Sequence, residues 1–237
     1  MNKTVRRLAA TLLCAVMAFS LSACTSAGVS GFDATTYLKG TLDQNYLGRY
    51  DEVFLALTDT TEPEGRRSYE ENVNREFEKR FCVYFQINPA VITPETKEGL
   101  KNLLRDAYAQ AKYEVSAAQA LSEDEYAVKV TFHPVALFSE FASDELEGLL
   151  ADFEQAYSST TEEALAAMTP KEHKAFEKLY EEDWANSILA ALEPHLGDVG
   201  YEDPVTKLIR VYPDEKEKQY TISDEDFVMM DDLILAY

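Results

Sequence analysis

The chain has 237 residues, of which 46% are hydrophobic and 11% aromatic, so it can fold around a core of its own and is not a disordered polymer. Its formal net charge of −21 disfavours binding to nucleic acid and to anionic lipid head groups, and it favours cations and basic partners. Cys14 and Cys24 lie near the N-terminus, which leaves Cys82 as the thiol of the body and predicts no internal disulfide.

Residues 1–24 are organised like an export signal. The segment begins with three basic residues, Lys3, Arg6 and Arg7. An apolar stretch follows from residue 8 to about residue 21, which is short for a membrane span of about 20 residues but suits a signal peptide. We therefore expect residues 1–23 to be removed. Three positive charges and no negative charge leave with them, so the formal net charge changes from −21 to −24.

The end of this segment resembles the lipobox of bacterial lipoproteins, which the chain matches at Leu21, Ser22, Ala23 and Cys24. The resemblance implies a diacylglyceryl group on the Cys24 thiol, carrying acyl chains such as palmitate, and cleavage between Ala23 and Cys24. Two acyl chains anchor a protein stably, whereas one does so only marginally. The segment thus predicts a lipoprotein precursor whose mature form is held at the extracytoplasmic face of the cell membrane. The alternative is an ordinary secretory signal that is cut at a small-residue site such as Ser22-Ala23 and leaves Cys24 as an incidental thiol.

After the cysteine, residues 25–31 have small side chains and include two glycines, which predicts a flexible tether over residues 24–31. A random coil of this length spans about 15 Å. The folded body is therefore expected to lie near the membrane, where its negative charge keeps it from lying flat on anionic lipid.

The first half of the body predicts helices followed by a hairpin. Residues 32–57 indicate two short helices with a break near Gly48, and residues 63–85 repeat apolar side chains every three or four positions. Thr93 and Pro94 have the pattern of a cap and a first-turn proline for a helix that continues to about residue 111. Apolar and polar residues then alternate over 113–117 and 126–132, which predicts two paired strands.

The second half predicts the same order. Helices are expected over 143–157, 161–168 and 169–193, the last opened by Thr169 and Glu172 in the spacing of a capping box. Residues 205–211 and 220–222 indicate a second hairpin, and Ser223 with Asp226 caps a final helix.

We therefore predict one α+β domain over residues 32–237, with helices packed on an antiparallel sheet of about four strands built from two hairpins. The mature segment is also loosely similar to uncharacterised lipoprotein domains of Gram-positive bacteria. The similarity lies in the acidic composition, the stretch after residue 32 and the hairpin-plus-helix ending. It includes no diagnostic motif, so it implies no catalytic or ligand-binding residue.

The sequence predicts no catalytic residue, metal site or cofactor. The three histidines, His133, His173 and His195, are far apart in the sequence. His173 and Glu177 are four residues apart, a spacing that fits an ordinary pair on a helix surface as well as it fits two metal ligands. Cys82 lies in an apolar run and is expected to be packed rather than reactive. Trp184 lies on the apolar stripe of its helix, so we expect a core residue rather than a carbohydrate platform.

The leading hypothesis is a lipid-anchored extracytoplasmic binding or interaction domain of the cell envelope. Its partners would be the membrane, through the lipid on Cys24, and a protein or small ligand, basic if electrostatics matter. The alternatives are a solute-binding lipoprotein of a transporter and an envelope hydrolase with paired carboxylates. The sequence lacks the alternating strand-helix-strand pattern of a two-lobed solute binder, and distant carboxylates would come together only in the folded chain.

Overall fold

The computed structural model describes residues 31–122, 125–141, 144–214 and 219–237. The predicted signal, the lipobox residues Leu21 to Cys24 and nearly all of the tether lie outside these ranges. The helices are α2 (Gly31–Leu47), α3 (Glu52–Leu57), α4 (Glu62–Glu76), α5 (Cys82–Tyr84), α6 (Pro94–Tyr108), α7 (Leu137–Phe141), α8 (Asp144–Tyr157), α9 (Glu162–Ala167), α10 (Pro170–Leu192) and α11 (Asp224–Ile234), with a π-helix η1 (Phe77–Phe81) and a 3-10 helix η2 (Glu193–Asp198). The strands are β1 (Lys112–Val115), β2 (Gln119–Ala120), β3 (Tyr126–His133), β4 (Val205–Asp214) and β5 (Gln219–Thr221).

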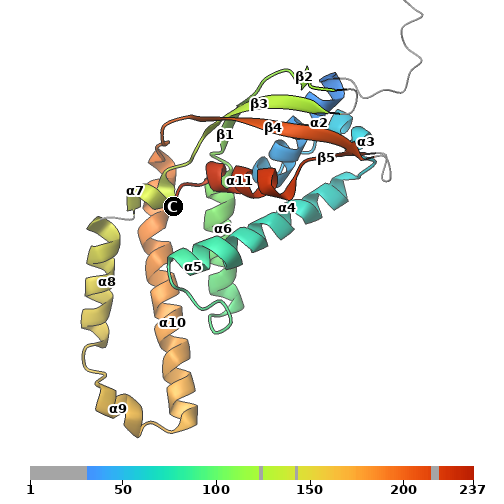
Figure 1. Cartoon of the computed structure of the whole chain (residues 1–237). Helices are drawn as coiled ribbons and strands as arrows, with labels where there is room; N and C mark the ends of the chain where they lie inside the picture. Colours follow the sequence, from blue (N-terminus) through green and yellow to red (C-terminus); the bar gives the residue numbers. More distant parts are fainter. Residues whose placement is uncertain (1–30, 123–124, 142–143, 215–218) are drawn as a thin grey trace, which may run out of the picture. The chain divides into compact units, whose positions relative to one another are not determined.

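The sheet is antiparallel and has the strand order β1-β3-β4-β5, with β2 also paired to β3. Val128, Val130 and Phe132 of β3 are fully buried, whereas Lys129 between them is exposed, as the period of two in the sequence predicts. Helices α2 and α11 contact this sheet (Figure 1). Both predicted hairpins are confirmed, and the pairing of β3 with β4 joins them into one sheet of a single α+β domain.

Helix α2 is one long helix rather than the short one that the sequence predicts. Leu38, Leu42 and Tyr46 form its buried stripe. Gly40 lies within the helix because a side chain there would collide with Phe54 of α3; a Cβ atom would lie 2.1 Å from the Phe54 ring. Gly48 follows the helix with φ of +58°, a conformation that glycine adopts without strain. The predicted break near Gly48 is therefore confirmed.

Helix α4, η1 and α5 form the continuous helical stretch that the sequence predicts over 63–85. Thr61 and Glu64 form a capping box at its start, which satisfies backbone N–H groups that have no partner within the helix. The π-helical turn was not predicted, because its wider winding leaves no periodic signal over so few residues. Phe81, which ends this turn, is fully buried and its ring lies 4.7 Å from that of Phe85.

A buried polar network fixes the C-terminus against this stretch. The Glu76 carboxylate is 3% exposed, accepts a hydrogen bond of 2.6 Å from the Tyr237 hydroxyl and lies 3.6 Å from the Arg80 guanidinium. Arg80 also donates to the backbone oxygen of Asp231 in α11, at 2.7 Å. Burial raises the pKa of Glu76, because the charged carboxylate loses more from leaving water than it regains from Arg80.

The helices between the two hairpins extend away from the sheet, and α8 and α10 run side by side, joined by α9 (Figure 1). The second half of α10 packs against α6, where the Glu182 carboxylate accepts hydrogen bonds from Thr93 and Thr96. The capping box of Thr169 and Glu172 is confirmed. Helix α7 and the 3-10 helix η2 were not predicted, because each is too short to show a periodic pattern.

Among the helices in these described ranges, none is both long and apolar enough to cross a membrane.

Candidate functional site

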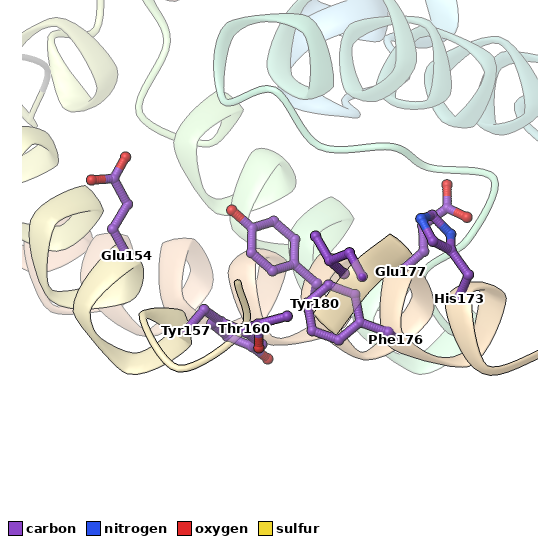
Figure 2. Close-up of a pocket in the computed structure, with 8 residues that line it drawn as sticks. Glu154, Tyr157, Thr160, His173, Phe176, Glu177 and Tyr180 are labelled. Carbon is purple, nitrogen blue, oxygen red and sulfur yellow. The ribbon is translucent and has the colours of Figure 1, made fainter. Parts of the chain in front are cut away.

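A hollow of about 470 Å³ opens between α8, α9 and α10 (Figure 2). Residues of three successive helices and of the connection between α8 and α9 line it: Glu154, Tyr157, Thr160, Leu165, His173, Phe176, Glu177 and Tyr180. Glu154 lies at one end of the hollow and Glu177 with His173 at the other, whereas the rings of Phe176 and Tyr180 lie between them. The hollow therefore presents an apolar floor with charged borders.

Three aromatic rings form this floor. The Tyr157 ring centroid lies 4.9 Å from that of Tyr180 and 5.9 Å from that of Phe176, and the two α10 rings are 6.0 Å apart. At these separations the rings touch one another, so an ammonium group cannot enter between them as it does in an aromatic cage. The rings instead offer a continuous surface on which another apolar side chain can pack.

A second hollow of about 350 Å³ continues the first toward the core, and Glu154 and Tyr180 line both. Its walls include Leu150, Phe153 and Trp184. The Phe153 ring lies 4.8 Å from that of Tyr180 and 5.0 Å from that of Trp184. We refer to the two hollows together as the α8–α10 groove.

The spacing of aromatic residues along the two helices produces the groove. Phe176, Tyr180 and Trp184 recur every fourth residue of α10, and Phe153 and Tyr157 do so in α8, so each set projects from one helix face. Trp184 is 8% exposed and its indole N–H donates to the backbone oxygen of Phe85 at 2.8 Å, which confirms the predicted core position.

Farther from the sheet, Phe176 and Tyr180 are only half-buried. Both belong to the same apolar stripe as Trp184, but a stripe with a period of four does not show where the covering layer ends. Among the described residues, α8 and α9 line the hollow over this part of the stripe, and the rings stay partly open to solvent.

The α8 side of the groove is acidic. The sequence of α8 has five acidic residues and no basic one. Glu154 and Glu177 are exposed and lie at opposite ends of the first hollow in Figure 2. The Tyr157 hydroxyl donates to the Asp183 carboxylate at 2.6 Å, and desolvation together with this carboxylate raises the pKa of Tyr157 to about 12. The phenol therefore stays neutral and fixes the ring at the groove wall.

This arrangement offers apolar contact rather than an evident catalytic centre. Glu154 and Glu177 point into solvent from opposite ends, so they do not form the close carboxylate pair that glycoside hydrolysis uses. His173 lies beside Glu177, as their spacing predicts. Within the described ranges, no three side chains of His, Cys, Asp or Glu gather closely enough to hold a metal ion.

The other residues singled out in the sequence lie elsewhere. His195 follows α10, and its Nε2 atom lies 3.0 Å from Glu145 Oε2. Cys82 is 2% exposed, which confirms the predicted packed position, and burial raises its pKa to about 12. The proposed lipidation and cleavage residues, Leu21 to Cys24, lie outside the part of the chain that the structure describes.

No protein-family model matches the chain, and no curated protein is significantly similar to it in sequence. Among solved structures, the chain is similar to ycdA, a candidate lipoprotein of Bacillus subtilis subsp. subtilis strain 168, with a TM-score of 0.52 and 12% identity. The similarity covers 86% of this chain and 56% of that one, so this chain spans little more than half the length of the solved protein. At this identity the similarity concerns the fold.

Proposed function

We propose that the mature chain is a lipid-anchored extracytoplasmic interaction domain that binds a basic, amphipathic helical segment of a partner protein in the α8–α10 groove. The observation that carries this proposal is the groove itself, a row of partly exposed aromatic side chains with acidic borders. The lipid anchor would hold the groove within reach of the membrane and of proteins embedded in it.

The anchor is supported by the match at Leu21 to Cys24 at the end of an apolar signal region. The fold is similar to that of a protein described as a candidate lipoprotein, which fits the same assignment. Lipidation of Cys24 would give two acyl chains and hence stable attachment, and export through the signal would place the domain on the extracytoplasmic face.

Apolar contact in the groove is supported by the exposure of its side chains. Leu150 is 43% exposed at the border of the second hollow, beside the rings of Phe153 and Trp184. Contiguous exposed apolar surface of this kind marks interaction sites, and buried aromatic anchors contribute most of the binding energy at protein interfaces. From Phe176 to Trp184 the helix rises about 12 Å, which matches roughly two turns of a docked helix.

The acidic residues at the groove distinguish among the molecules that could bind in it. The acidic residues of α8, together with Glu177, repel anionic lipid head groups and also a second copy of this acidic chain. A partner helix with leucine-like side chains on one face and Lys or Arg beside them would fill the hollows and pair with Glu154 and Glu177.

Site-specific photo-crosslinking in living cells tests the docking proposal. A photoreactive amino acid replaces Leu150 at the groove or, as the control, Leu208, which is 67% exposed on β4. We expect the probe at residue 150, and not the probe at 208, to capture one partner through a basic amphipathic segment, identified by mass spectrometry of the crosslinked peptide.

Charge reversal at Glu154 and Glu177 should reduce this capture, whereas reversal at two exposed acids outside the groove, Asp106 and Glu114, should not. Equal capture from both probe positions, or attachment to an acidic segment, would contradict the docking proposal.

Membrane fractionation tests the anchor separately. Cys24→Ala should release the chain from lipid attachment and abolish incorporation of a labelled palmitate analogue. If this variant stays in the membrane fraction as fully as the unmodified sequence does, the anchor proposal is wrong, whatever the crosslinking shows.

A further inference from the structure

The sheet has a second face, opposite the one on which the core is built. Alternate side chains of β3 and β4, such as Val128 and Ile209, point to the core and are fully buried. The residues between them project from the other side, where Lys129, Leu208 and Arg210 are exposed. We call this side the outer face of the sheet.

A leucine lies beside basic side chains on the outer face. Leu208 is 67% exposed and lies directly opposite Lys129 in the pairing of β4 with β3. Arg210 follows Leu208 by two positions, so it projects from the same side of the strand. In amphipathic helices that bind membrane surfaces, apolar side chains enter the boundary of head groups and acyl chains, while flanking Lys and Arg attract anionic head groups. The outer face offers the same combination on a sheet.

Basic residues outnumber acidic residues on the outer face. The charged residues there are Lys112, Lys129, Arg210, Glu114 and Glu125, and Arg210 lies 3.2 Å from Glu125. Helices α8, α9 and α10, in contrast, contain twelve acidic and three basic residues. The negative charge of the folded body is therefore unevenly distributed, and the outer face carries none of the excess.

Distance determines which of these charges a membrane can sense. The Debye length at physiological ionic strength is about 8 Å. Helix α10 has 23 residues and is about 34 Å long, and with α8 it extends away from the sheet (Figure 1). Salt therefore screens most of this acidic charge from a membrane at the outer face. The net charge, which led us to expect that the body would not lie flat on anionic lipid, is not what this face presents.

The tether begins at the edge of the sheet that includes β2. Gly31 starts α2, and a Cβ atom there would lie 3.4 Å from the Ala118 backbone oxygen. The Thr35 hydroxyl accepts a hydrogen bond of 2.9 Å from the Ala118 backbone N–H, which fixes the start of α2 to this part of the chain. The next residue, Gln119, is exposed and belongs to β2. A tether that spans about 15 Å would hold the lipid on Cys24 close to this edge.

The centre of the outer face lies within the same reach. Gln119 pairs with Ala127 of β3, and Lys129, two residues farther along β3, pairs with Leu208. Two strand residues span about 7 Å, and neighbouring strands lie about 5 Å apart. A membrane surface that holds the lipid on Cys24 can therefore contact Gln119 and Leu208 at the same time.

We propose that the outer face of the sheet rests on the anionic head groups of the membrane that holds the lipid anchor, with Lys129 at the phosphates and Leu208 inserted between the head groups. This proposal rests on the lipid anchor of the proposed function. Helices α8, α9 and α10 would then extend away from the membrane surface, where their groove is open to a partner segment that projects from it.

Fluorescence quenching by a labelled lipid tests the proposal. The chain, lipidated in the cell, is placed in phosphatidylcholine vesicles with about 30% phosphatidylglycerol and a lipid that carries a nitroxide on its head group. A fluorophore is attached to a cysteine introduced by Gln119→Cys on the outer face or, as the control, by Gln155→Cys at an exposed position of α8. Cys82 is buried, and the thiol of Cys24 carries the lipid, so the introduced cysteine takes the label.

We expect quenching at residue 119 to exceed that at residue 155 about threefold or more, and to weaken when salt is added or phosphatidylglycerol is left out. Lys129→Glu combined with Leu208→Ser should remove this difference. Both side chains are exposed, so the double variant should unfold at the same urea concentration as the unmodified chain. The matched control, Lys174→Glu with Leu179→Ser at exposed positions of α10, should leave the quenching at residue 119 unchanged.

The outcomes separate this proposal from the anchor. If the chain sediments with the vesicles but residues 119 and 155 are quenched equally, or the double variant is quenched like the unmodified chain, docking of the outer face is wrong and the anchor stands. A chain that does not sediment with the vesicles would refute both. Capture of an acidic protein segment by the photoreactive probe at residue 208 would assign the outer face to a protein instead of lipid.

Discussion

Replacing the aromatic residue at either end of the row in α10 with alanine should change the stability of the protein by very different amounts. Trp184 is 8% exposed, contacts Phe153 and donates to the Phe85 backbone oxygen, so Trp184→Ala removes a large buried ring and leaves that oxygen without its donor. Such a change costs about 3–5 kcal/mol. Phe176 is half-buried two turns earlier in the same helix, where little covers it. Phe176→Ala should cost only about 1 kcal/mol.

Urea unfolding followed by far-UV circular dichroism measures both costs. For a chain of this size, 1 kcal/mol corresponds to a shift in Tm of about 2–4 °C, so the two variants should be clearly resolved in a thermal scan as well. If Phe176→Ala destabilises the protein as much as Trp184→Ala does, the row is a continuous part of the core. The interpretation of its outer end as an open binding surface would then be wrong.

Three further variants or treatments test particular features of the fold. Because burial raises the pKa of Glu76 in the folded state, stability should fall as pH rises above the ordinary value of 4.5, and Glu76→Gln should remove that part of the pH dependence measured by urea unfolding. Gly40→Ala places a Cβ atom 2.1 Å from the Phe54 ring and should cost about 1–3 kcal/mol in the same assay; an unchanged midpoint would refute the close approach of α2 and α3. Cys82 should react with a thiol reagent at neutral pH only after unfolding, as mass spectrometry of its peptide would show, and rapid labelling of the folded protein would contradict its burial.

The elements of the fold with a clear period or a capping signal could be predicted from the sequence. The alternation around Val128 and Val130 identified the central strand, and Thr169 with Glu172 identified the start of α10. These signals are local: the side chains that form them lie within a few residues of one another. The π-turn before Phe81 and the 3-10 helix after α10 carry no such signal, because a change of winding over one turn does not alter the spacing of apolar residues visibly.

The groove could not be predicted, because it depends on which elements cover the aromatic side chains rather than on the side chains themselves. Phe176 and Trp184 belong to one stripe, yet only Trp184 meets the core. The aromatic spacing in 153–157 and 176–184 was the one available signal, since it places two aromatic faces on neighbouring helices.

Trp184 provides the most direct test of docking in the groove, because it is the only tryptophan in the chain and lines the second hollow. The measurement is its fluorescence in the full-length chain during titration with a Lys/Leu amphipathic helical peptide of about 18 residues, or five turns, that lacks tryptophan. A Glu/Leu peptide with the same apolar face is the control. We predict a saturable change in emission with the basic peptide that weakens as salt is added, and none with the acidic peptide. No change with either peptide, or the same change with both, would contradict a groove that selects basic amphipathic helices.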